Sequence, residues 1–303
     1  SSSHILNPQT QVALFMAGDI AGPVLVDDPE RFAIEAVDGS NHPDVEALGN
    51  EVFTRQNPLL RELGVDAETW GRLEAWDTEG WDRSGCSLLM RDRAAGGRVV
   101  AFAVVQVHSF FHEPPHPTFF KDLTDMCPNI AILFSVAGPT IGEAWKKSGG
   151  IACSLAGRTL RFAAGGTREG YEGLGLQRRL RVRVMEMARE RGYDRLVVET
   201  INPATQHLWR QFGCEQLAAR PLSEGRLADG SQPFAGLKLE FTVQEKVFRR
   251  RPLRDSKVAQ VVSGMALLSA FACKACCPAS CSQFMFKVGC SACCCEFGPW
   301  SRR

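Results

Sequence analysis

The chain has 303 residues, of which 45% are hydrophobic and 23% charged, values typical of a globular protein that buries a core. This length leaves room for one large domain or two small ones. The formal net charge at pH 7 is +1, so overall charge attracts neither a membrane surface nor nucleic acid, and we expect no nucleic-acid partner.

The first residues predict a leader to a single domain. Residues 10–26 are fairly apolar, but Asp19 and Pro23 interrupt them, which makes a poor membrane span and a poor secretory signal. We therefore expect residues 1–30 to be a flexible leader and residues 31–245 to form the domain.

Cysteine is distributed unevenly along the chain. Eight cysteines crowd into Cys273–Cys295, and four are scattered through the domain, at Cys86, Cys127, Cys153 and Cys214. The scattered four are typical of buried thiols in a reducing compartment, which predicts a cytoplasmic protein.

The first part of the domain predicts alternating strands and helices. The expected elements are strand Phe32–Val37, a helix between Pro43 and Arg55, a helix over Asp66–Trp76, and strands Cys86–Met90 and Val99–Val107. A long stretch, Ser109–Gly157, follows and begins with three prolines. We expect a lid or substrate loop with some helix, whose phenylalanines either line a slot for an amine or pack the lid onto the domain: Phe110, Phe111, Phe119 and Phe120.

The second part predicts one helix more clearly than any other element. The expected elements are strand Thr159–Ala164, helix Leu176–Arg191, strand Leu196–Val198, helix Pro203–Phe212 and strand Gly236–Val243. Helix Leu176–Arg191 has one apolar stripe, arginines on its other faces and Gly192 just past its end. The order of strands and helices predicts an α/β domain of the α+β type built on a mixed sheet.

A glycine-rich turn precedes this arginine-rich helix, over Gly170-Tyr171-Glu172-Gly173-Leu174-Gly175. Glycines let the backbone approach a ligand closely, and the first turn of the helix presents unpaired N–H groups and the positive end of its dipole. Together these features predict an anion site suited to a pyrophosphate.

Two common nucleotide motifs do not fit this turn. A Walker loop ends in Gly-Lys-Ser/Thr, which is absent, and a dinucleotide fingerprint needs a third glycine that is missing after Gly173-Leu174-Gly175. The turn also lies deep in the chain rather than after the first strand. A pyrophosphate ligand of another kind therefore fits better.

The turn resembles the coenzyme A motif of the GNAT superfamily of N-acetyltransferases, Gln/Arg-x-x-Gly-x-Gly/Ala. Gly173, Leu174 and Gly175 match its core, whereas Gly170 stands where the family has Gln or Arg, and Arg168 or Arg178 would compensate. A second half-motif follows in the right order, because Asn202-Pro203-Ala204 and the segment through Trp209 to Gly213 resemble the family's Asn-x-x-Ala/Ser-x-x-Leu/Ile-Tyr ending.

This resemblance implies a mixed, mostly antiparallel sheet flanked by helices, and acetyl-CoA as co-substrate. The main chain of Ala163, Ala164 and Gly165 would pair with the pantetheine arm between two splayed strands. The glycine turn would hold the pyrophosphate, and Asn202 would bind the pantetheine. The residues implied to hold the cofactor are Ala163, Ala164, Gly165, Arg168, Gly170, Tyr171, Gly173, Leu174, Gly175, Leu176 and Asn202.

The resemblance leaves the two proton-transfer roles open. The usual acid of the family is a Tyr, and Trp209 at that position has no ionisable proton, so water protonates the thiolate, the thiolate leaves unassisted, or activity has been lost. One branch of the family has a basic Glu before Pro-Leu, where this chain has Asn57. Glu199 is the substitute candidate for the base, unless it is a structural carboxylate, and His112 and His116 are alternatives.

Residues 246–303 differ in composition from the domain. A basic stretch is followed by an apolar one, Val258–Ala272, which is shorter than the about 20 residues that span a bilayer, and then by the crowded cysteines. The Cys-x-x-Cys pairs beginning at Cys273 and Cys290 would suit zinc, and acylated cysteines beside basic residues would suit an anionic membrane. The leading expectation is a poorly ordered tail without a metal.

The sequence thus predicts an N-acetyltransferase that moves an acetyl group from acetyl-CoA to a primary amine by direct attack in a ternary complex. A small-molecule amine is favoured over a protein. The alternative is a non-catalytic acyl-CoA-binding protein of the same fold, because Trp209 and Asn57 stand at the acid and base positions.

Overall fold

The computed structural model describes residues 28–77, 81–108, 118–148, 150, 153–154, 156–227 and 229–248. Nearly all of the expected leader and tail, including the crowded cysteines, lies outside these residues. So do His112, His116, Phe110 and Phe111 of the expected lid.

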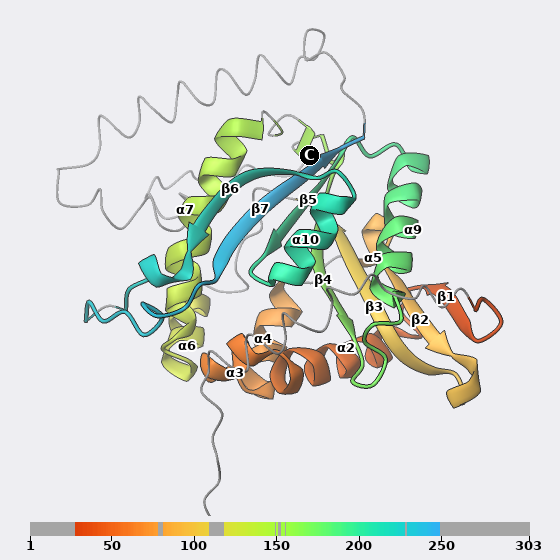
Figure 1. The fold of residues 1–303 in the computed structure, drawn as a ribbon, viewed down its shortest axis with the longest axis horizontal. Coiled ribbons are helices and arrows are strands. Elements are labelled where there is room, and N and C mark those ends of the chain that lie inside the picture. Colours follow the sequence, from red (N-terminus) through yellow and green to blue (C-terminus); the bar gives the residue numbers. More distant parts are fainter. Residues whose placement is uncertain are drawn as a thin grey trace, which may run out of the picture.

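A seven-stranded sheet organises the described chain (Figure 1). Its strands are β1 (Phe32–Ala36), β2 (Leu88–Asp92), β3 (Arg98–Val107), β4 (Thr159–Thr167), β5 (Arg195–Thr200), β6 (Glu215–Pro221) and β7 (Glu240–Val247). They are ordered β1-β2-β3-β4-β5-β7-β6, and all neighbouring pairs are antiparallel except β4 with β5. The prediction of a mixed, mostly antiparallel sheet is confirmed.

Helices cover both faces of this sheet. They are α2 (His42–Asn50), the π-helix η1 (Glu51–Gln56), α3 (Pro58–Glu62), α4 (Ala67–Asp77), α5 (Trp81–Ser84), the 3-10 helix η2 (Arg93–Ala95), α6 (Phe119–Met126), α7 (Ile130–Ser148), α9 (Leu176–Glu190), α10 (Pro203–Gln211) and the 3-10 helix η3 (Leu222–Glu224). None of the helices in the described ranges is long and apolar enough to cross a membrane.

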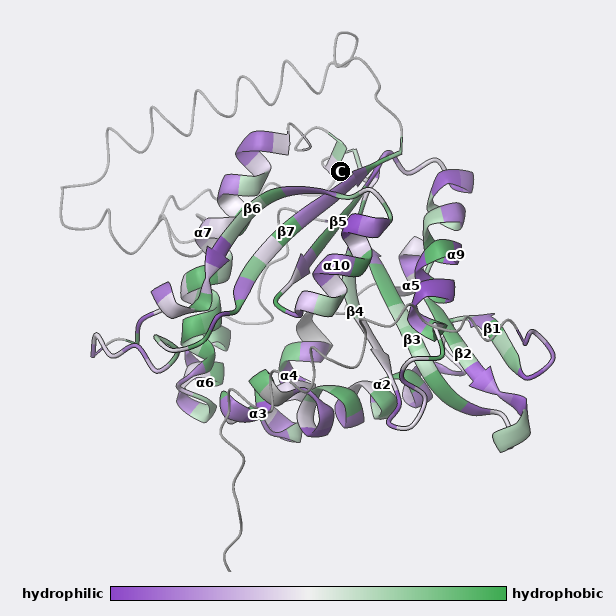
Figure 2. Ribbon diagram, viewed as in Figure 1, coloured by the Kyte–Doolittle hydropathy of each residue, from purple (hydrophilic) through white to green (hydrophobic). Residues whose placement is uncertain are grey.

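Alternation along β3 divides the core between the two faces. Ala101 and Ala103 join the cluster that the apolar stripe of α9 and Trp209 of α10 bury, whereas Phe102 and Val104 pack with α2 on the opposite face. Figure 2 shows β3 largely hydrophobic and α9 in alternating hydrophilic and hydrophobic bands, as expected for a buried strand and an amphipathic helix. Each fully buried Leu, Val or Phe on these elements contributes about 1.5–3 kcal/mol of hydrophobic stabilisation.

Much of Ser109–Gly157, the stretch expected to be a lid, instead belongs to a buried apolar cluster shared with β7. Its apolar run continues as the 19-residue helix α7, whose Ile132 and Val136 share a buried cluster with Phe241 and Val243 of β7. Phe120 contacts Phe134 with ring centroids 5.2 Å apart, so these aromatic side chains pack α6 onto α7. The helix forms because packing its apolar face against the sheet removes that face from water and so stabilises the helix.

The sequence analysis misses one strand, β6, and starts the last strand too early, at Gly236 instead of Glu240. Asn57 follows the π-helix in an extended conformation, and its side chain accepts hydrogen bonds from the N–H groups of Leu59 and Leu60 and so caps α3.

Candidate functional site

The two parallel strands at the centre of the sheet diverge after a short ladder. Their pairing runs from Thr159 with Arg195 to Phe162 with Val198. Beyond this point β4 pairs with β3 alone, and the end of β5 pairs with β7 (Figure 1). The facing edges of the two strands therefore open into a V, where backbone groups are available to an extended ligand.

A β-bulge lies at the apex of this V. Ala164 pairs with Val104, but Phe162 pairs with Val105, so Ala163 is an extra residue in β4. A bulge leaves the inserted residue unpaired and bends the strand, and bulges are frequent next to active sites. Gly165 follows on the same strand, where a Cβ would lie 2.9 Å from the ring of Phe162, so a larger residue would force that ring to move.

The glycine turn forms an open corner at the end of β4. Gly170, Gly173 and Gly175 have φ of 84°, 74° and 73°, a region that favours glycine. A Cβ built at Gly170 or Gly173 would meet no atom within 4 Å, so the described chain does not fill the corner. Gly175 is the N-cap of α9 without a side-chain cap, which leaves the N–H groups of the first turn for a ligand.

Two side chains of the predicted cofactor set point away from this corner. Arg168 pairs with Glu51 of η1 and donates from Nε to the carbonyl of Val99 at 3.0 Å. The hydroxyl of Tyr171 donates to Asp92 at 3.1 Å. Both residues therefore brace the turn from behind, and contacts from them to a ligand would come from the main chain.

The remaining predicted residues lie along the corner and the V. Leu176 is buried, Leu174 packs partly against the same core, and the carboxylate of Glu172 accepts a hydrogen bond from the N–H of Gly170 at 2.7 Å. Asn202 follows β5 and caps α10, because its Oδ1 accepts from the N–H of Thr205 at 3.1 Å. Since β4 and β5 are parallel, Asn202 and the glycine corner lie at the same end of the sheet.

The two residues considered for proton transfer have different surroundings. Glu199, near the end of β5, accepts a hydrogen bond from Nε of Arg161 at 3.1 Å, and 10% of its side chain is exposed. Trp209 is fully buried, and its ring makes an edge contact with Phe162 at 5.1 Å between centroids. The position of the usual Tyr acid is therefore part of the core.

Sequence reasoning missed two polar residues of α9 that face this region. Gln177 donates from Nε2 to the carbonyls of Phe102 and Gly166, at 2.9 and 2.7 Å, and so ties the helix to β3 and β4. Arg181 is buried beneath α9, although the sequence analysis places the arginines of this helix on faces other than its apolar stripe. The signal for its burial was available, because Arg181 shares helical spacing with the buried Met185 and Ala188.

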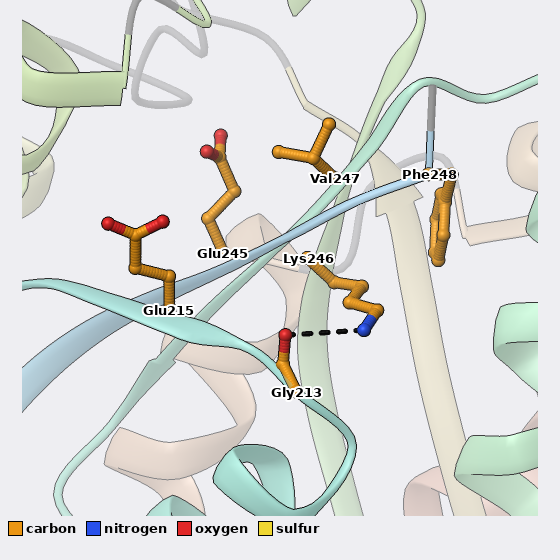
Figure 3. Close-up of a pocket in the computed structure, with 6 residues that line it drawn as sticks. All are labelled: Gly213, Glu215, Glu245, Lys246, Val247 and Phe248. Carbon is orange, nitrogen blue, oxygen red and sulfur yellow. Dashed lines mark hydrogen bonds between the residues drawn. The ribbon is translucent and has the colours of Figure 1, made fainter. Parts of the chain in front are cut away.

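A cavity adjoins each end of β7 in the described sheet. The smaller, of about 180 Å³, lies at the far end of β7, where Lys246 donates to the carbonyl of Gly213 at 3.2 Å (Figure 3). Glu245, which also lines this cavity, pairs with Arg195 at 2.7 Å. The polar groups of this cavity are thus largely engaged. The larger, of about 500 Å³, opens between the start of α10 and the segment before β7, beside Pro203 and Leu237.

The described residues contain no group of three or more His, Cys, Asp or Glu that would hold a metal ion. Their four cysteines are free thiols, of which Cys153 is half-buried and the other three are buried. Burial raises the pKa of Cys86 to about 11 and that of Cys214 to about 12, so both thiols are neutral at physiological pH.

No family model and no curated protein sequence matches the chain. Among solved structures, it is similar to arylalkylamine N-acetyltransferase 2 from Aedes aegypti, with 12% identity and a TM-score of 0.53 over 72% of this chain and 99% of that one. It is also similar to the C-terminal condensation domain of Ebony in complex with beta-alanyl-dopamine, with 15% identity and a TM-score of 0.50 over 72% of this chain and 99% of that one.

The mixed sheet of this chain combines one splayed parallel pair, a bulge at the apex and a glycine corner. The chain has the fold of the GNAT N-acetyltransferases.

Proposed function

We propose that this protein is an N-acetyltransferase that moves an acetyl group from acetyl-CoA to a primary amine in a ternary complex. The observation that carries the proposal is the open glycine corner at the mouth of the V between β4 and β5. The N–H groups at the start of α9 suit a diphosphate, and the free edge of β4 suits an extended arm with amide groups.

The residues present fit coenzyme A in this arrangement. Gly173, Leu174 and Gly175 would bind the pyrophosphate through main-chain N–H groups, with Gly170, Tyr171 and Leu176 beside them. Ala163, Ala164 and Gly165 would pair with the pantetheine. The Nδ2 group of Asn202 makes no hydrogen bond within the described chain, so it is available to the same arm. Acetyl-CoA would supply an activated acyl group as a thioester.

The chain itself would hold the amine and the thioester in position and would remove a proton from the amine. Holding an amine in line with a thioester carbonyl supplies much of the rate by making the encounter intramolecular. Glu199 lies near the open end of β5 and is our proposed base, acting on the amine directly or through water. Its pairing with Arg161 fixes the orientation of the carboxylate.

The amine is proposed to be a small molecule that enters through the larger cavity. This cavity adjoins Pro203, next to Asn202, and combines the apolar side chains of Leu237 and Leu239 with the amide of Gln206. Such a mixture of apolar walls and a few polar groups is typical of small-molecule pockets. The names of the two structural neighbours mention an arylalkylamine and a dopamine conjugate, so aromatic ethylamines are the first class to test.

A non-catalytic acyl-CoA-binding protein is the second candidate function. Two observations favour it: Trp209 is packed into the core at the acid position, and Asn57 uses its amide oxygen to cap α3 at the base position. Neither side chain can transfer a proton as a Tyr or a Glu would.

Two measurements on the purified full chain separate these candidates. Coenzyme A at about 100 times its Kd should stabilise the native state by about 2.7 kcal/mol, seen as a rise in Tm. Acetyl transfer to a panel of primary amines, followed by release of free thiol, should then occur, with Glu199→Gln lowering kcat by roughly 10²–10⁴. Stabilisation without turnover would establish the binding protein, and a Tm unaffected by coenzyme A would contradict both.

A further inference from the structure

Arg181 is a buried cation without an anion. It lies on α9, and only 4% of the residue is exposed. Its guanidinium lies over two rings, 5.3 Å from the centroid of Phe162 and 5.2 Å from that of Trp209. No ion pair or hydrogen bond joins it to another described residue, and its Nε atom is buried without a partner.

This environment is unusual for an arginine. A buried charge is normally paired, because removing it from water is costly, and contact with aromatic rings offsets only part of that cost. Burial lowers the pKa of Arg181 to about 10, which still leaves the guanidinium charged at neutral pH. The site therefore presents a positive charge that no described acidic group neutralises.

A second donor without a partner lies beside this charge. Nε1 of Trp209, on α10, is buried and makes no hydrogen bond within the described chain. Unsatisfied buried donors are rare in folded proteins, and two whose side chains contact the same ring, that of Phe162, point to an acceptor that binds there.

The position of these donors indicates which acceptor would bind. Phe162, which both side chains contact, is the last β4 residue that pairs with β5, and the bulge at Ala163 is the next residue. The two donors therefore lie one residue from the apex of the V, where a pantetheine arm lying along β4 would end in its sulfur atom.

We propose that Arg181 stabilises the negative charge that develops on the coenzyme A sulfur when the acetyl group leaves, with the N–H of Trp209 as a second donor. This inference rests on the proposed acetyl transfer. It assigns an electrostatic role to α9 in a chain whose α10 has Trp in place of an acidic hydroxyl.

The reaction balances without a proton donor at the sulfur. The amine nitrogen forms a bond to the carbonyl carbon, the carbon–sulfur bond breaks, and its electron pair stays on sulfur as a thiolate. The proton lost by the amine passes to Glu199 or to water. A fixed cation aimed at a site of developing charge accelerates such a step because it needs no reorganisation at the moment of reaction.

The test measures the thiol of bound coenzyme A in the full chain. Ultraviolet absorbance of the thiolate is followed against pH in the complex of wild type with coenzyme A, and in Arg181→Met. We expect the thiol pKa in the wild-type complex to lie at least one unit below that of free coenzyme A, and the substitution to abolish this difference. Arg189→Met is the matched control, because Arg189 is an exposed α9 arginine that lies over the ring of Phe248.

Desulfo-coenzyme A separates an effect on sulfur from an effect on the fold. Affinity of wild type for coenzyme A should rise as the thiol ionises, whereas affinity for the desulfo analogue should not change with pH over that range. Both Arg181→Met and wild type should bind the analogue equally. Two further variants replace Arg181→Met if it does not fold. Arg181→Lys keeps a cation and should keep a lowered thiol pKa, whereas Trp209→Phe keeps a ring but loses the N–H donor and should raise that pKa.

The outcomes distinguish the two proposals. If coenzyme A binds but its thiol titrates identically in wild type and in Arg181→Met, or in Trp209→Phe where Arg181→Met does not fold, the role of Arg181 is wrong and acetyl transfer stands. If wild type binds neither coenzyme A nor its desulfo analogue, both proposals fall.

Discussion

Gly173 combines a left-handed backbone with open space around its missing side chain. Gly173→Val should therefore leave the core intact, cost about 1–2 kcal/mol of stability through backbone strain, and block the corner. We expect the Tm increase produced by coenzyme A to disappear, which thermal denaturation with and without ligand will measure.

Gly192 provides a matched control for that substitution. Its φ is 84° and a Cβ there would also meet no atom within 4 Å, but it follows the opposite end of α9. Gly192→Val should show similar strain and full stabilisation by coenzyme A. Equal loss in both variants would mean that strain, not the blocked corner, causes the effect.

Asp92 connects the back of the glycine turn to the edge of the sheet. The hydrogen bond from Arg31 lowers the pKa of this carboxyl group below its ordinary 3.8, with help from Tyr171 and the N–H of Ala94. Because the folded state holds this proton less tightly than the unfolded state, the resulting stabilisation is present above pH 3.8 and is lost as pH falls through the lower folded-state value.

Asp92→Asn should therefore weaken the dependence of stability on acid pH. Chemical denaturation at about pH 6 and about pH 3 should show a smaller loss of unfolding free energy on acidification in the variant than in wild type. An identical loss in both proteins would mean that Asp92 does not contribute to the acid sensitivity.

At the scale of elements, α7 meets the segment after β6 with no room for a side chain. A Cβ at Gly225 would lie 2.4 Å from a methyl group of Ile132 and 3.1 Å from one of Val136. Gly225→Ala should overpack this contact and lower the unfolding free energy by about 1–3 kcal/mol. Urea denaturation will measure it against Gly236→Ala, where a Cβ meets no atom within 4 Å.

The elements that the sequence predicted well differ physically from those it missed. Helix Leu176–Arg191 has a continuous apolar stripe and a terminal glycine, and the structure has α9 within one residue of it. Strand β6 has only Ala218 buried and lies at the edge of the sheet, so its sequence lacks a strong alternation. Edge strands obtain their conformation from pairing with a neighbour, here β7, and local sequence does not encode that partner.

At the scale of the whole molecule, the buried clusters of the described chain are built from residues up to 248. The clusters on the two faces of the sheet join elements from β1 to β7. We therefore predict that a chain ending at residue 248 folds with an unchanged Tm and binds coenzyme A as the full chain does. Calorimetry of both chains will measure this, and a fall of several degrees in the shorter chain would contradict the predicted domain boundary.

The sequence by itself determined the class of fold and the order of its main elements, because the glycine turn, the amphipathic α9 and the strand alternation are local patterns. It also named residues that the structure brings together at the corner and the V. Only the tertiary structure revealed the helix α7 on the second face, the engagement of Arg168 with Glu51, and the contact of the Arg181 guanidinium with the rings of Phe162 and Trp209. These depend on contacts between segments distant in the chain, and no local pattern specifies which distant side chain will neutralise, or fail to neutralise, a charge.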